Sequence, residues 1–147
     1  MTKTQNLSTA LITGAASGIG LAIATKLAES GYCVVVSDAN GDAAKSIATT
    51  LRERGFEAHA ATLDVSSEDD IASTIDSIGS RQGRIDILVN NAGVQYVSRL
   101  EDFPTERWKF LIDVLLVGPA LLTRAALPLM RRQNFGRIVN IGSIHSL

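Results

Sequence analysis

The sequence has few of the features that mark membrane, secreted or nucleic-acid-binding proteins. Its 147 residues include one cysteine and three prolines, and the formal net charge is -1. A single thiol cannot form a disulfide within the chain, and a nearly neutral chain has no electrostatic reason to bind nucleic acid or an anionic membrane. The longest apolar stretch, 114–122, is interrupted by Gly118 and Pro119 and is shorter than a bilayer span. We therefore predict a soluble, cytoplasmic protein with neither kind of partner.

Two residues often found in reactive or metal sites are interpreted here as structural. Cys33 opens an apolar run that continues to Val36, which indicates a buried thiol rather than a nucleophile. His59 lies in the middle of a strand candidate with no partner evident in the sequence. We therefore expect no metal site.

Short β-branched runs alternate with longer helical patterns. The strand candidates are 9–13, 33–37, 57–63, 85–90 and 137–141. The helix candidates are 19–30, 42–54, a segment from Ser66 or Ser67 to Gly79, and 105–131, in which Pro119 and Pro128 predict a kink or two segments. Nearly continuous apolar strands suit a parallel sheet covered on both faces. The pattern predicts an α/β, Rossmann-type doubly wound sheet over residues 1–147, truncated after the fifth strand.

A glycine-rich loop separates the first strand from the first helix. It reads Thr-Gly-x-x-x-Gly-x-Gly over residues 13–20. A pyrophosphate needs backbone N–H donors and the positive end of a helix, and side chains would block its approach. We predict that the loop binds a dinucleotide, with Gly14 in the tight turn, Gly18 in close contact and Gly20 packing the helix on the sheet. The remaining contacts are assigned to Ser17, through its hydroxyl, and Ile19.

Acidic residues end the second and third strands. Asp38 comes about 20 residues after the loop, where a carboxylate accepts both ribose hydroxyls and repels a 2′-phosphate. No arginine follows it, so we predict NAD rather than NADP. Asp64 and Val65 are assigned to the adenine edge, with a helix cap as the alternative for Asp64.

The loop spacing, together with Asn-Asn-Ala-Gly at 90–93, resembles the short-chain dehydrogenase/reductase family. The resemblance implies that Asn91, Ala92 and Gly93 border the adenosine and ribose. The family also places a catalytic serine at the end of the fifth strand, and the segment 137–143 matches that pattern, which makes Ser143 the candidate.

Two further polar residues indicate a small anionic substrate. Gln95 follows Gly93 by two residues, and His145 follows Ser143 by two. The pairing is similar to that of NAD-dependent D-3-hydroxybutyrate dehydrogenases, in which the corresponding residues hold the substrate carboxylate. An amide and an imidazole on neighbouring strand ends suit a small anion. The alternative is that Gln95 is an ordinary polar loop residue and that His145 has no role in substrate binding.

The sequence departs from the family pattern in two places. The family's Tyr-x-x-x-Lys acid–base pair does not occur within the 147 residues, and Leu115 stands where the family usually has an asparagine that supports a proton relay. We expect an NAD-dependent 3-hydroxy acid dehydrogenase whose isolated 147-residue chain does not turn over. The alternative is a non-enzymatic dinucleotide-binding module or a non-functional fragment. The family resemblance further implies a homo-oligomer, dimer or tetramer, assembled through the 105–131 helix.

Overall fold

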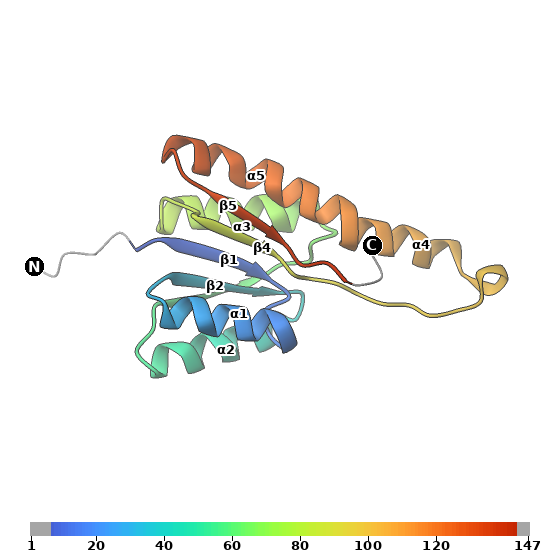
Figure 1. Cartoon of the computed structure of the whole chain (residues 1–147), viewed down its shortest axis with the longest axis horizontal. Helices are drawn as coiled ribbons and strands as arrows, with labels where there is room; N and C mark the ends of the chain where they lie inside the picture. Colours follow the sequence, from blue (N-terminus) through green and yellow to red (C-terminus); the bar gives the residue numbers. More distant parts are fainter. Residues whose placement is uncertain (1–6, 144–147) are drawn as a thin grey trace, which may run out of the picture.

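The computed structural model describes residues 7–143 and contains one five-stranded parallel sheet in the order β3-β2-β1-β4-β5 (Figure 1). The strands are β1 (Thr9–Thr13), β2 (Cys33–Asp38), β3 (Ala58–Thr62), β4 (Ile87–Asn90) and β5 (Arg137–Asn140). Each neighbouring pair is parallel. All five expected strands are present, each within two residues of its predicted bounds, and the predicted Rossmann-type fold is confirmed.

Helices cover both faces of the sheet (Figure 1). They are α1 (Gly18–Glu29), α2 (Gly41–Glu53), α3 (Glu68–Arg81), η1 (Leu100–Asp102), α4 (Thr105–Ile112), η2 (Asp113–Val117) and α5 (Gly118–Arg132). One core cluster joins the sheet to α1 and α2, and a second joins it to α3 and α5. Ser67 caps α3 by accepting a hydrogen bond from the Asp70 amide. The helix does not end at Gly79 as predicted, because its final turn continues to Arg81.

The last helical region consists of two α-helices joined by a π-helical turn. The π turn, Asp113–Val117, lies just before Pro119, which occupies the first turn of α5. A proline in a helix removes an N–H donor and crowds the carbonyl four residues earlier, here that of Leu115, so the wider π turn accommodates it. The predicted interruption is confirmed at Pro119, whereas Pro128 lies inside α5 without ending it.

The apolar part of this region is longer than the 114–122 stretch considered in the sequence analysis. Thr105–Arg132 forms 28 helical residues with a mean hydropathy of 1.8 in its most apolar window, which by length and composition could cross a membrane. The expectation that the apolar stretch is too short was wrong, because Gly118 and Pro119 are preceded by a π turn that does not end the helical run. Its C-terminal half packs on the sheet beside α3 through Leu122, Ala126 and Leu129, as the core helix of a globular domain does.

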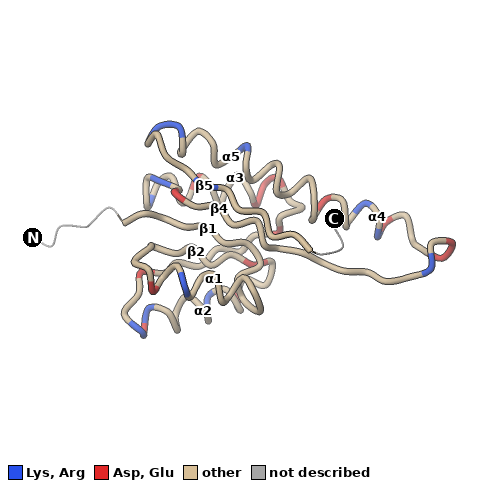
Figure 2. The backbone as a smooth tube through the Cα atoms, viewed as in Figure 1, with Lys and Arg blue, Asp and Glu red and all other residues tan. Residues whose placement is uncertain are grey.

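Lys, Arg, Asp and Glu residues lie mainly on the helices and connecting turns, and the strands contain almost none (Figure 2). Only Asp38 and Arg137, at opposite ends of their strands, are charged strand residues. A sheet packed on both faces has little room for ions, so the charges that remain near it stand at its edges.

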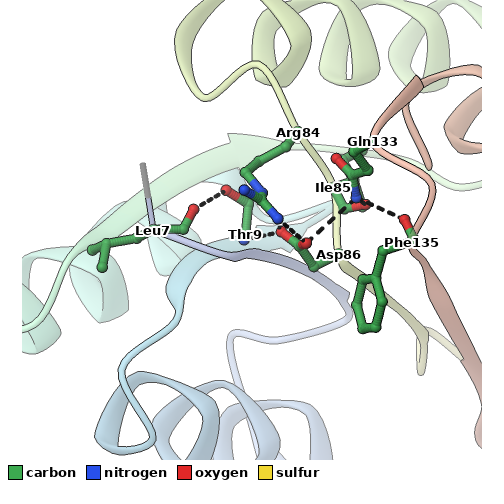
Figure 3. Close-up of polar contacts among 7 residues, drawn as sticks. All are labelled: Leu7, Thr9, Arg84, Ile85, Asp86, Gln133 and Phe135. Atoms are coloured by element: carbon green, nitrogen blue, oxygen red, sulfur yellow. Dashed lines mark hydrogen bonds and ion pairs between the residues drawn. The ribbon is translucent and has the colours of Figure 1, made fainter. Parts of the chain in front are cut away.

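A buried carboxylate joins the strands at their amino ends (Figure 3). Asp86 is 1% exposed and accepts hydrogen bonds from the Thr9 amide at 2.7 Å and from Arg84 Nε at 2.8 Å and Nη2 at 2.6 Å. Gln133, after α5, donates to the Ile85 carbonyl at 2.6 Å. The hydrogen bond to Asp86 raises the pKa of the Arg84 guanidinium above its usual value. This network fixes the amino edge of the sheet and leaves the carboxyl edge for the loops.

Candidate functional site

The loops that follow β1, β2, β3 and β4 meet in a cleft of about 460 Å³ at the carboxyl edge of the sheet. Its lining residues are Gly14, Ser17, Gly18, Ile19, Asp38, Ala39, Leu63, Asp64, Val65, Asn91, Ala92, Gly93, Val94, Phe110 and Val114. The structure therefore brings together, in one cleft, ten of the eleven residues assigned to the cofactor from the sequence. In doubly wound sheets, ligands bind at this edge.

The eleventh residue, Gly20, lies beneath the loop. A Cβ atom there would overlap the carbonyl of Gly14, so only glycine lets the first turn of α1 approach the loop that precedes it. The contact is with the loop itself rather than with the sheet, which corrects the role assigned to Gly20 from the sequence. Gly14 adopts a positive φ of 61°, and a Cβ atom there would lie 2.8 Å from the Cα atom of Ala92.

The amino end of α1 opens into the cleft. Gly18 begins the helix, and a Cβ atom built on it would meet nothing within 4 Å. Ser17 is the N-cap residue, and its hydroxyl makes no capping hydrogen bond. The first N–H groups of a helix have no partner inside the helix, and they carry partial positive charge. The turn therefore presents donors to an anion without a side chain in the way.

Asn91 ties the glycine loop to the end of β4. Its Nδ2 donates to the carbonyls of Thr13 at 3.0 Å and Gly14 at 3.1 Å. The Thr13 hydroxyl accepts the amides of Asn91 and Ala92, both at 3.0 Å. On the other side, Asn90 Nδ2 donates to Asn140 Oδ1 in β5 at 2.8 Å. The two asparagines thus link three adjacent strands, and they set the shape of the cleft floor.

Two carboxylates stand on the cleft wall. Asp38 Oδ2 accepts the Ala16 amide at 3.2 Å, and Oδ1 accepts the Asn40 amide at 3.0 Å. Asp64 Oδ1 accepts both the amide and the hydroxyl of Ser66, at 2.9 and 2.6 Å. Each carboxylate oxygen has more than one acceptor site, so these bonds orient the side chains and leave capacity for a ligand.

Gln95 and Ser143, assigned to substrate binding and catalysis, are not among the residues that line the cleft. Both are exposed, and His145 lies outside the described residues. Leu115 is 51% exposed in the π turn, and its Cδ2 atom lies 3.5 Å from where a Gly93 Cβ atom would be. At this position the side chain therefore presents methyl groups where the family usually presents an amide.

The sequence analysis missed part of the cleft wall. Ala39, Leu63 and Val94 each adjoin a predicted residue, whereas Phe110 and Val114 are apolar residues without a motif. Phe110 and Val114 come from α4 and the π turn, about two thirds of the chain length after the glycine loop. Ala39, Leu63 and Val94 could have been predicted from the adjoining motif residues. Phe110 and Val114 reach the cleft only because the long helical region folds over it.

His59 contacts the carboxylate of Glu57, a partner that was not evident in the sequence. Its Nε2 lies 3.0 Å from Glu57 Oε1, on the same face of the β3 edge. Cys33 is buried as predicted, and burial, with a smaller contribution from the charge of Glu57, raises the pKa of its thiol to about 11. The thiol without a bound ion therefore stays protonated at neutral pH, which agrees with its interpretation as a structural thiol and not a nucleophile.

A doubly wound sheet with a glycine loop, an acidic second-strand end and an Asn-Asn-Ala-Gly floor defines a dinucleotide-binding class of α/β protein. Comparison with known families narrows this class. A family model described as short chain dehydrogenase matches residues 8–147, so the chain belongs to the short-chain dehydrogenase family.

Curated relatives agree with this assignment. A D-beta-hydroxybutyrate dehydrogenase of Cupriavidus necator is 43% identical over 97% of this chain, and one of Rhizobium meliloti is 41% identical over 95% of it. An uncharacterized oxidoreductase, YxjF, of Bacillus subtilis is 46% identical over 94% of the chain. The chain spans about half the length of these relatives, 54–55% of each.

Solved structures confirm the fold. A gluconate 5-dehydrogenase from Burkholderia cenocepacia, in complex with NADP and tartrate, is 40% identical with a TM-score of 0.89, over 95% of this chain and 55% of its own. A 7α-hydroxysteroid dehydrogenase complexed with NADH is 34% identical with a TM-score of 0.90, over 95% of this chain and 54% of its own. Both nicotinamide dinucleotides thus occur among structures of this fold.

Proposed function

We propose that residues 1–147 form the NAD-binding domain of a dehydrogenase that acts on a small 3-hydroxy acid such as D-3-hydroxybutyrate. The observation that carries the proposal is the single cleft lined by the glycine loop, Asp38, Asp64 and residues 91–93. The donors of the loop suit a pyrophosphate, and the apolar surfaces of Val65 and Val114 suit an adenine ring.

The carboxylate of Asp38 favours NAD over NADP. It already accepts two backbone amides, which hold its two oxygens at the mouth of the cleft. Ribose hydroxyls are donors and match such a group, whereas a 2′-phosphate is an anion and is repelled by it. Relatives that bind NADP share the fold, so the choice rests on Asp38 and not on the family.

The substrate assignment rests on residues that follow β4 and β5. When bound, NAD accepts the hydride of a secondary alcohol. Gln95 would donate its amide to the substrate carboxylate, His145 would provide a second donor, and Ser143 would hold the substrate oxygen. The named D-beta-hydroxybutyrate dehydrogenases among the relatives support this substrate class. Proton transfer requires an acid–base pair such as the family's Tyr-x-x-x-Lys, which these 147 residues do not contain.

Steady-state kinetics of a protein extended through such a Tyr-x-x-x-Lys segment tests the substrate class. We expect NAD-dependent oxidation of D-3-hydroxybutyrate. Gln95→Ala should raise KM about tenfold or more, because a hydrogen bond to a charged group contributes roughly 1.5–3 kcal/mol. Gln82→Ala, at the far end of α3, is the matched control and should leave KM unchanged. Turnover of another secondary alcohol but not of this acid would contradict the substrate class and leave the family intact.

A dinucleotide-binding module without catalysis is the second candidate. Leu115 favours it, because its methyl groups replace the amide that supports the family's proton relay. If the extended protein binds NAD, measured as a rise in melting temperature, but turns over no secondary alcohol, this candidate replaces the dehydrogenase.

We propose in addition that the whole protein is a cytoplasmic homo-oligomer, a dimer or tetramer. The α4 and π-turn region exposes Ile112, Leu115 and Leu116 together, and a run of exposed apolar side chains of this kind is typical of an interface. Sedimentation of the extended protein tests this, since a monomer at micromolar concentration would contradict it.

A further inference from the structure

A cluster of three potential metal ligands lies at the amino edge of the sheet, away from the cleft. It consists of Cys33, at the start of β2, Glu57, just before β3, and His59, the second residue of β3. We call it the edge cluster. The β2–β3 register pairs Val34 with Ala58 and Val35 with His59. Cys33 therefore stands beside Glu57, and the two-residue period of a strand places His59 on the same face.

The ligand atoms of the edge cluster are already close to a metal-binding arrangement. The Cys33 sulfur, a Glu57 carboxylate oxygen and a His59 ring nitrogen all lie within 4.8 Å of one another. A tetrahedral zinc ion, with bonds of about 2.0–2.3 Å, needs its ligand atoms roughly 3.3–3.8 Å apart. Glu57 and His59 side chains are 55% and 34% exposed, so small rotations of both can close the remaining gap.

We propose that Cys33, Glu57 and His59 bind a divalent ion of the zinc class, with water in the fourth position. One sulfur, one nitrogen and one oxygen ligand favour zinc or cobalt over magnesium or calcium, which prefer oxygen alone. The Cys33 thiol loses its proton to solvent when its sulfur binds the ion. Thiolate and carboxylate then neutralise the two positive charges, so the nearly buried sulfur does not leave a net charge at the sheet edge.

The surroundings limit what such an ion can do. Arg81 and Gln82, at the end of α3, line the space beside His59, and the positive charge of Arg81 opposes cation binding. Asp38 lies five residues further along β2, about 16 Å away at 3.3 Å per residue. The ion therefore does not touch the cofactor cleft. It joins the edge strand β3 to β2, and so stabilises the adenosine half of the sheet.

Cobalt titration of the 147-residue chain tests the proposal, because cobalt replaces zinc and reports its ligands by absorption. We expect one ion per chain, a thiolate-to-cobalt charge-transfer band in the near ultraviolet, and intense visible bands typical of tetrahedral geometry. Zinc should displace the cobalt and raise the melting temperature. Cys33→Ser should abolish the charge-transfer band, and Glu57→Gln and His59→Gln should each weaken binding at least tenfold.

The other histidine of the chain provides the matched control. His145→Gln should leave cobalt affinity unchanged, whereas an unfolded chain that gathers metal around its one cysteine would use either histidine. Equal losses in His59→Gln and His145→Gln would therefore overturn the proposal. The absence of a charge-transfer band in the unmodified chain, or full affinity in His59→Gln and Glu57→Gln, would overturn it as well.

Discussion

Replacing Asp38 by asparagine should remove the preference for NAD. The substitution keeps the size of the side chain and one of its oxygens, but it removes the negative charge. In the structure, Asp38 holds the Ala16 and Asn40 amides with separate oxygens, so the asparagine can retain only one of these bonds. Asn40 is exposed, and water can replace the bond that it loses.

The size of the effect follows from the position of the carboxylate. Two unit charges 4 Å apart repel by about 1 kcal/mol in water and about 4 kcal/mol at the effective dielectric of a protein surface. Asp38 is partly buried at the mouth of an open cleft, so a value near 2 kcal/mol is appropriate. That energy corresponds to roughly a thirty-fold change in the ratio of the two dissociation constants.

Calorimetric titration of both dinucleotides into both proteins measures this ratio. Because each protein is compared with itself, any loss of folded protein cancels. Asp42→Asn is the matched control, since this acid lies on α2 with its side chain 96% exposed and forms an ion pair with Lys45 at 3.5 Å. An unchanged ratio in Asp38→Asn, or a preference of the unmodified chain for NADP, would refute the reasoning.

Further substitutions test the packing that shapes the cleft. Asp86→Ala should lower the free energy of unfolding, measured in urea, by about 3 kcal/mol, because it leaves the buried Thr9 amide and the Arg84 guanidinium without this acceptor. As the control, Asp42→Ala should change the free energy of unfolding by less than about 0.5 kcal/mol. Equal losses would show that the network is not stabilising. Gly20→Ala should greatly weaken NAD binding, since its Cβ would displace the Gly14 carbonyl. In Gly79→Ala the added Cβ would meet Leu129 at an ordinary 3.6 Å, so this substitution should stabilise the folded chain by roughly 0.5–1 kcal/mol in thermal unfolding. NAD affinity unaffected by Gly20→Ala would contradict the loop geometry.

Much of the fold follows from local sequence rules. Each strand is a short apolar run ended by a polar residue, and the cap at Ser67 and the interruption at Pro119 follow from known chemistry of helix ends and prolines. The misjudged helix end at Gly79 has a different origin. Gly79 lies beside Leu129 of α5, and the packing of the two helices outweighs the low helix propensity of glycine.

The candidate site likewise contains residues that the sequence predicts and residues that only the folded structure identifies. Residues of the glycine loop and the strand ends were predictable, because parallel strands bring their carboxyl ends to one edge. Phe110 and Val114 were not, since they reach the cleft only when the long helix folds over it. The Glu57–His59 contact lies within a two-residue strand period and could have been predicted, but the approach of Cys33 depends on the pairing of β2 with β3.

Hydrogen–deuterium exchange of the chain with and without NAD tests the central claim most directly, because it locates the ligand along the backbone. NAD should slow exchange at residues 14–20, 38–39, 63–65 and 91–94, and it should leave the amino edge around Thr9 and Asp86 unchanged. Unchanged exchange at saturating NAD, or protection confined to segments outside the cleft, would contradict the account.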